Sequence, residues 1–506
     1  MSRIMFFIPL LLVSCLPASE DVKPSARAPL GMNLSGVRDW STELVFVDAF
    51  KSARAWISQA PGQPWGKGGP LDLDARGHVR SLHHKQYAES VVWTDFKDQY
   101  PAGKYVCLYE GEGNLDFTGD ARVVARKPGE LSVEVSNRNG SAFCRITRTD
   151  PKNPIRNIRL FPTEALATYA EAPFRKEFLD RWKGFRVFRF MDWQQTNDST
   201  LTTWDDRPTP DDHSQGIRGV ALEHMIALCN TLQVEPWFCM PHRATDAFIR
   251  RFARLVREKL DPKLRVHVEY SNECWNGQFQ QARYCAEQGQ KLGLSKNRYE
   301  GQLRFYSQRS VEIFRLWEEE FAGRERLVRV LASQSANPWT GSTVLDWQDA
   351  HKQADAIAIA PYFGNRFGDP KTAAEVAEMS VEDLLKALEK DLAANRNILK
   401  TYATLARKRN LQLMAYEGGQ HLAGYGGAEN NEQLTRLFHQ ANRHPGMEKL
   451  YRLDLEQWHS AGGGLYCVFS SMGNYSKWGS WGVLEHRLQD PTRVPKMRAL
   501  RDYLKE

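Results

Sequence analysis

The sequence predicts an α/β protein: a (β/α)8 barrel, or TIM barrel, with a β-sandwich inserted after the first barrel strand. Eight short and nearly continuous apolar runs follow one another along the chain, and segments with helical spacing fill most of the gaps between them. One gap, from residue 36 to 184, is far longer than a usual connection and has the composition of antiparallel strands. With 506 residues, 42% of them hydrophobic, the chain is long and apolar enough for more than one domain.

The eight apolar runs are the predicted barrel strands. Near-continuous hydrophobicity is typical of parallel strands that are buried on both faces. In chain order the runs cover residues 30–35, 185–193, 234–241, 265–273, 327–333, 356–363, 411–418 and 464–471.

Helical periodicity appears between these runs, so strand and helix alternate as in a (β/α)8 barrel. The clearest predicted helices cover residues 217–232, 244–260, 384–406, 432–442 and 496–504, with another from about 298 to 321. A helix over 166–182 is expected to lead into the second barrel strand.

The long gap predicts the inserted domain. Alternating stretches at 90–96, 103–109, 121–125, 131–135 and 141–147 are separated by turns that carry glycine, asparagine or proline. This pattern indicates a small antiparallel β-sandwich. The expected organisation is therefore a first barrel strand and loop at 30–52, the insertion at 53–162, and the remainder of the barrel at 163–506.

The N-terminus predicts export from the cytoplasm. Arg3 precedes an apolar run at 4–13 that is too short to span a membrane and suits a signal peptide. The run ends in Leu12-Val13-Ser14-Cys15, which resembles the lipobox of bacterial lipoproteins. That resemblance implies a signal peptide at 1–15, lipidation of Cys15 and a tether at 16–29. The expected location is extracytoplasmic and lipid-anchored, or periplasmic or secreted if the lipobox is not used.

Composition argues against several partners and cofactors. A net charge of +7 without a lysine-rich run does not support nucleic-acid binding. The seven other cysteines include no Cys-x-x-Cys pair, so neither a metal site nor a cofactor is expected. Cys107–Cys144 and Cys274–Cys285 are conceivable disulfides. We expect a monomer that meets the membrane only through its lipid anchor.

Two glutamates stand where predicted barrel strands end. Glu273 closes the fourth run after Asn272, and Glu417 closes the seventh run after Tyr416. Active sites of such barrels form at the carboxyl ends of the strands, so the two carboxyl groups are expected to meet there. One protonated and one ionised carboxyl group in an aromatic surrounding is what cleavage of a glycosidic bond requires.

Asn272-Glu273 and Glu417 on strands four and seven resemble the clan A glycoside hydrolases, which are retaining enzymes with features like those of family 5. The resemblance implies that Glu273 is the general acid and base, that Glu417 is the nucleophile, and that Asn272 binds the sugar 2-hydroxyl. It also implies that Arg189 keeps the nucleophile ionised and that Tyr362 donates a hydrogen bond to it.

Further side chains are candidate sugar contacts. His242 follows the third strand and is a candidate polar contact, while Trp478 and Trp481 follow the eighth strand and are candidates for the floor of the central subsite. Trp275 is expected at a further subsite, as are three more tryptophans that end or follow barrel strands, Trp193, Trp237 and Trp339.

This sequence departs from the pattern of the clan at two motif positions, and its large early insertion is also unusual. Cys274 stands where proline commonly follows the acid, and Ala360 stands where strand six often carries histidine. The family and the sugar therefore stay open.

The leading hypothesis is a retaining β-glycosidase that acts on a poly- or oligosaccharide at the cell surface. The alternative from another class is a non-catalytic carbohydrate-binding surface lipoprotein, although both key glutamates are present. An inverting enzyme would differ by a wider separation of the carboxyl groups. An esterase is disfavoured because the chain has no Gly-x-Ser-x-Gly motif, and metal-dependent hydrolysis because it has no His-Glu-x-x-His motif.

Overall fold

The computed structural model describes residues 27–95 and 98–505. The predicted signal peptide, Cys15 and most of the predicted tether lie outside these residues. Within the described part of the chain, no helix is both long and apolar enough to cross a membrane.

Eight parallel strands close into a barrel in which neighbours in space follow chain order. The strands are β1 (Leu30–Asn33), β12 (Val187–Arg189), β13 (Glu235–Met240), β14 (Val266–Tyr270), β15 (Leu327–Ala332), β16 (Ala356–Ile359), β17 (Gln412–Ala415) and β18 (Tyr466–Phe469). Each of the eight predicted runs contains one of these strands, so the predicted barrel is confirmed. Nearly every strand residue is buried, because helices cover the outside of the barrel and side chains fill its inside.

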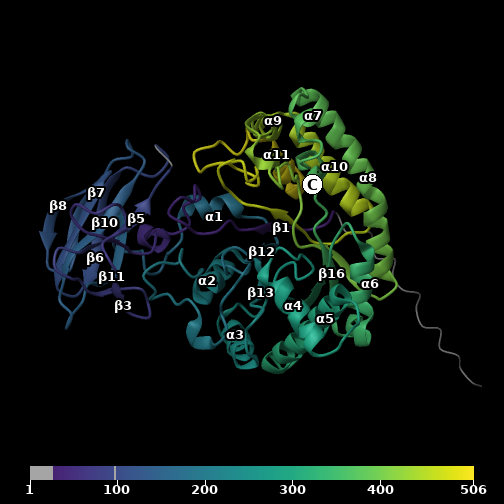
Figure 1. The fold of residues 1–506 in the computed structure, drawn as a ribbon, viewed down its shortest axis with the longest axis horizontal. Helices are drawn as coiled ribbons and strands as arrows, with labels where there is room; N and C mark the ends of the chain where they lie inside the picture. Colours follow the sequence, from purple (N-terminus) through teal and green to yellow (C-terminus); the bar gives the residue numbers. More distant parts are fainter. Residues whose placement is uncertain (1–26, 96–97, 506) are drawn as a thin grey trace, which may run out of the picture.

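The helices that surround the barrel agree with most of the predicted ones (Figure 1). Helices at predicted positions are α2 (Leu222–Leu232), α3 (Asp246–Lys259), α5 (Arg298–Phe321), α8 (Val381–Arg407), α9 (Glu432–Arg443) and α11 (Pro495–Lys505). Four helices were not predicted: α4 (Gln280–Lys291), α6 (Pro338–Asp346), α7 (Ala373–Ala377) and α10 (Gly446–Ser460). Short 3₁₀ segments complete the connections: η1 (Ala49–Ser52), η2 (Thr163–Ala165), η3 (Trp204–Asp206), η4 (Trp347–Gln353), η5 (Asn365–Gly368) and η6 (Ala428–Asn430).

The helix before the second barrel strand is shorter than predicted. Helix α1 covers only Lys176–Trp182, whereas the sequence predicts a helix from residue 166. Pro173 explains the late start, because proline lacks a backbone N–H and disfavours helical geometry in the residue before it.

Residues 57–162 form two four-stranded antiparallel sheets and a small hairpin, which Figure 1 draws to one side of the barrel. One sheet contains β2 (Ile57–Gln59), β5 (Tyr87–Trp93), β10 (Ala142–Thr149) and β7 (Gly113–Gly119). The other contains β11 (Arg156–Pro162), β6 (Gly103–Glu110), β9 (Glu130–Val135) and β8 (Ala121–Lys127), and the hairpin pairs β3 (Asp72–Leu73) with β4 (Val79–Ser81). Buried side chains from both sheets form one hydrophobic cluster, separate from that of the barrel.

This two-sheet insertion is held against the carboxyl ends of the barrel strands. Arg54 forms a salt bridge of 2.6 Å with Asp39, which lies in the loop after β1. The long loop between β12 and α2 also contacts the insertion, because the His213 N–H donates to the Arg76 carbonyl (2.9 Å) between β3 and β4, and the His213 ring packs against Trp56. The insertion therefore borders the face of the barrel where the candidate site lies.

All seven cysteines in the described residues are buried free thiols. Neither of the two conceivable disulfides, Cys107–Cys144 and Cys274–Cys285, is therefore present in this structure.

Candidate active site

The buried guanidinium group of Arg189 is the centre of a polar cluster at the carboxyl end of the barrel. Its Nη1 donates to Glu417 (2.8 Å) and to Asn33 (3.2 Å). Its Nη2 donates to Glu269 and to Asn272, both at 2.8 Å. Strand register explains part of this convergence, because Asn33 and Arg189 are directly paired across β1 and β12.

Glu417 lies two residues after the end of β17 and is 5% exposed. One carboxylate oxygen accepts from Arg189, and the other accepts from the Tyr362 hydroxyl at 3.0 Å. Burial raises the pKa of Glu417, whereas the positive charge of Arg189 and the hydrogen bond from Tyr362 oppose this rise. Both donors thus favour the ionised form of Glu417.

Glu273 lies three residues after β14, in a loop where the backbone turns sharply. Its φ of 44° lies in the left-handed region, as does that of Ser271 at 59°. The carboxylate accepts from the Asn276 amide (2.9 Å) and from the Tyr416 hydroxyl (3.1 Å). Burial, followed by the negative charge of Glu417, raises the pKa of Glu273 to about 7. Glu273 and Glu417 therefore lie within electrostatic range of each other but in different surroundings.

Asn272 is oriented by hydrogen bonds on both sides of its amide. Its oxygen accepts from Arg189, and its nitrogen donates to the Asn197 side chain at 3.0 Å. Gln281 on α4 donates to the Asn272 carbonyl (2.9 Å) and to Asn197 (2.7 Å). The amide plane of Asn272 is therefore fixed next to the two glutamates.

An aromatic cluster adjoins the Glu417 side of the site. Trp481 makes edge-to-face contacts with Tyr362, His421 and Phe469 at ring-centroid distances of 6.0, 4.8 and 5.7 Å. Trp481 thus touches the tyrosine that binds Glu417. Trp275 donates from its indole nitrogen to the Tyr416 hydroxyl (3.3 Å), which in turn binds Glu273. Both aromatic side chains are therefore part of the cluster around the two glutamates.

Trp478 and His242 stand apart from this cluster. Trp478 is 64% exposed, and only its backbone carbonyl contacts Trp481. His242 is buried against Tyr284 of α4, and neither ring nitrogen has a partner among the described residues. Burial lowers the pKa of His242 to about 4, so its ring is neutral at pH 7.

The three further tryptophans take different positions. Trp193 is 1% exposed and donates to the Ser35 carbonyl, and Trp237 is fully buried and donates to Glu269 at 2.9 Å. These two are core residues rather than surfaces for a sugar, because their rings are already packed. Trp339 is 45% exposed and packs against Tyr299 of α5.

Sequence reasoning missed several polar members of the cluster. Asn33 and Glu269 lie within strands, where a polar residue in an apolar run is the only available signal. Tyr416 and Asn276 are close in sequence to the predicted glutamates, but their hydroxyl and amide contacts depend on loop geometry. Asp192 adds another carboxyl group, whose pKa burial and the negative charge of Glu417 raise to about 6.

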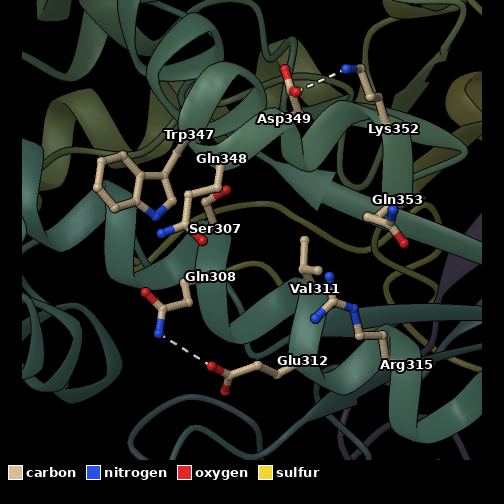
Figure 2. A pocket seen from close by; sticks show the side chains of 10 residues that line it. All are labelled: Ser307, Gln308, Val311, Glu312, Arg315, Trp347, Gln348, Asp349, Lys352 and Gln353. Carbon is tan, nitrogen blue, oxygen red and sulfur yellow. Dashed lines mark hydrogen bonds and ion pairs between the residues drawn. The ribbon is translucent and has the colours of Figure 1, made fainter.

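A hollow of about 400 Å³ lies elsewhere, between α5 and η4 (Figure 2). Gln308, Arg315 and Trp347 are among its lining residues, and Asp349 pairs with Lys352 at its edge. None of the residues around Arg189 lines it. Among the described residues, no cluster of His, Cys, Asp and Glu has an arrangement that could hold a metal ion.

No family model and no curated protein matches this chain. Among solved structures, a 4-O-α-L-rhamnosyl-β-D-glucuronidase from Fusarium oxysporum is 12% identical with a TM-score of 0.39, over 64% of this chain and 62% of the other. A GH5-4 endoglucanase from Clostridium acetobutylicum is 11% identical with a TM-score of 0.36, over 64% of this chain and 89% of the other. An endo-β-1,4-mannanase from Cellulomonas fimi is 9% identical with a TM-score of 0.35, over 63% of each chain. This chain thus spans less than two thirds of the first and third, and the barrel assignment rests on strand pairing.

Proposed function

We propose that this protein is a glycoside hydrolase that cleaves a β-glycosidic bond in a poly- or oligosaccharide with retention of configuration. The observation that carries the proposal is a pair of glutamates in unlike surroundings. Glu417 accepts from a cationic guanidinium group and a hydroxyl, which suits an ionised nucleophile. Among the described residues no cation contacts Glu273, and its pKa of about 7 suits an acid that is partly protonated at neutral pH.

In the first step, the protonated Glu273 gives its proton to the glycosidic oxygen while Glu417 attacks the anomeric carbon. The bond to the leaving group breaks, and an ester between the sugar and Glu417 forms. In the second step, ionised Glu273 takes a proton from water, the water oxygen attacks the anomeric carbon, and the ester breaks. Asn272, Arg189, Tyr362, His242, Trp275, Trp478 and Trp481 are the proposed substrate-binding and positioning residues.

The electrostatic coupling supports the change of role in Glu273. In the free enzyme the negative charge of Glu417 raises the pKa of Glu273. Formation of the ester removes this charge, so the pKa of Glu273 falls, and after protonating the leaving group the carboxylate stays ionised until it takes a proton from water. The same side chain is thereby an acid in the first step and a base in the second.

Two variants test the assignment of the glutamates. Glu417→Gln is expected to lower turnover more than about 10³-fold without loss of fold. Glu273→Ala is expected to lower turnover of natural glycans by about 10²–10⁴-fold but to spare glycosides with acidic leaving groups, which need little protonation. The control is Glu389→Gln, an exposed residue of α8 that pairs with Lys449.

Full turnover by Glu417→Gln would contradict the assignment of Glu417 as the nucleophile. Equal losses on both substrate types by Glu273→Ala would contradict the assignment of Glu273 as the acid. Proton NMR of the first anomer released by the wild type reports the stereochemistry, and release of the inverted anomer would contradict retention. Binding of glycans without hydrolysis by the wild type would identify a carbohydrate-binding lipoprotein instead.

The proposed location is extracytoplasmic, with a lipid anchor at Cys15. We also infer that the two four-stranded sheets at 57–162 form the β-sandwich of the predicted insertion at 53–162, because one hydrophobic cluster joins them. Incorporation of a labelled fatty acid into the wild type but not into Cys15→Ser tests the anchor. Equal labelling of both proteins would contradict it.

A further inference from the structure

The amino ends of the barrel strands lie on the face opposite the two glutamates. All eight strands are parallel, so the loops that lead into them share this face, while Glu273 and Glu417 follow the strands at their other ends. The N-terminal segment reaches the barrel here. Arg27 stacks on Tyr503 of α11, the Ala28 N–H donates to the Tyr503 hydroxyl (3.1 Å), and β1 begins at Leu30.

A broad hollow of about 820 Å³ opens on this amino-end face, at the starts of β14, β15, β16 and β17. Its basic lining residues outnumber its acidic ones. The acidic lining residues are Glu325 and Asp355, and the basic ones are Arg265, Arg324, Arg329, Lys352, Lys408 and Arg409, together with His351. Asp355 is already bound by the buried Arg329 at 2.7 Å. Among the described lining residues, Glu325 is therefore the acidic one left for the other cations.

Several cations on this face have no ion pair among the described residues. Arg324 and Lys408 are exposed at the hollow and lack a carboxylate within 4 Å, whereas Arg409 pairs with Asp346 and Lys352 pairs with Asp349. Three more exposed lysines without an ion pair among the described residues lie on the same face: Lys183 precedes β12, and Lys259 and Lys263 precede β14. At the hollow itself, the basic residues thus outnumber the carboxylates that could neutralise them.

We infer that the amino-end face binds the anionic headgroups of the membrane to which the chain is anchored, with the two glutamates directed away from the lipid. This inference rests on the proposed lipid anchor at Cys15. Eleven residues separate Cys15 from Arg27, and they can span at most about 40 Å. The anchor therefore keeps the start of this face within about 40 Å of the bilayer. Lysine and arginine near an anionic surface strengthen such binding, beyond the anchor that the sequence alone predicts.

The test uses a chain that begins at Ser19, which lacks Cys15 but retains every residue that the structure describes. It is expected to float with vesicles of phosphatidylcholine and phosphatidylglycerol, and not with vesicles of phosphatidylcholine alone. The double variant Arg324→Glu, Lys408→Glu is expected to bind the anionic vesicles at least about tenfold more weakly. Added salt is expected to weaken the binding of the wild type.

The matched control is the double variant Lys104→Glu, Arg138→Glu, two exposed residues of the insertion without an ion pair among the described residues. It makes the same change in net charge and should bind like the wild type. Equal loss in both variants, equal binding to both vesicle types, or displacement by free glycerol phosphate would overturn the inference. Hydrolysis of a soluble glycan is measured in parallel and should not differ among these proteins. Absence of that hydrolysis, with vesicle binding intact, would refute the proposed function alone.

Discussion

Arg189 divides its positive charge between two carboxylates. Besides Glu417, it binds Glu269 through Nε (3.2 Å) and Nη2 (2.8 Å), and Trp237 donates to the same oxygen of Glu269. The negative charge of Glu269 is one of the causes that raise the pKa of Glu417. Glu269 is thus a positioning residue: it fixes the guanidinium plane and limits the stabilisation that Arg189 gives to the Glu417 anion.

Glu269→Gln is expected to move the acid limb of kcat/KM to lower pH, because Arg189 then stabilises the Glu417 anion alone. The shift should be about one pH unit at most, with a loss of about 1–3 kcal/mol in the free energy of unfolding. A pH–rate profile with urea unfolding measures both. The matched control is Glu235→Gln, a buried glutamate at the start of β13 that pairs with Arg186 and Arg265. It should lose stability without a shift of the limb, and an equal shift in both variants would contradict the assigned role.

Tyr416 lowers the pKa of Glu273 through a single hydrogen bond. Because Glu273 must be protonated in the first step, kcat/KM is expected to fall as pH rises through about 7. The Tyr416 hydroxyl opposes the rise in the pKa of Glu273 by donating to its carboxylate. Tyr416→Phe is therefore expected to move the basic limb to higher pH, which a pH–rate profile with a soluble glycoside measures. A basic limb that stays in place or moves down would exclude this contact as a determinant of the pKa.

At the scale of elements, helix α10 and strand β18 are joined by a buried carboxyl group. Asp454 of α10 is 4% exposed and accepts from the Tyr466 hydroxyl of β18 at 2.5 Å. Burial raises the pKa of Asp454 to about 7, well above its ordinary value of 3.8. The folded state therefore binds a proton that the unfolded state releases, and Asp454 lowers stability as pH rises from about 4 to above 7.

Asp454→Asn removes this titration but keeps an oxygen that can accept from Tyr466. Relative to the wild type, the free energy of unfolding of the variant is expected to increase with pH, by up to about 4 kcal/mol at pH 8. Urea unfolding at pH 5 and pH 8 measures the difference. Asp383→Asn, an exposed residue in the first turn of α8, should show no such trend. A stability difference for Asp454→Asn that is the same at both pH values would contradict the prediction.

Sequence patterns predicted elements better than contacts between elements. The eight barrel strands were recognisable because burial on both faces leaves long apolar runs. The sequence did not predict helix α4, because the segment is rich in glutamine and charged residues and its buried residues are mostly small or polar rather than a clear apolar stripe. The two glutamates could be proposed because strand ends mark the site of a barrel. Glu269 could not, since only the closed barrel brings it to Arg189 of β12.

On the scale of the whole molecule, the two ends of the barrel carry different chemistry. The carboxyl end holds the glutamates, the aromatic cluster and the insertion, and the amino end holds the unpaired cations and receives the N-terminal segment. The sequence did not predict this division, because the unpaired cations precede four different strands and form no run. Their common face follows only from the parallel direction of all the strands.

The loop between β12 and α2 connects the insertion to the neighbour of the proposed acid. Near its start, Asn197 accepts from Asn272, the residue before Glu273. Farther along, His213 is held by the insertion through the Arg76 carbonyl and the Trp56 ring. Replacing the insertion with another domain would therefore require a redesigned loop as well, since the same stretch of backbone supports the accessory domain and aligns the amide beside the proposed acid.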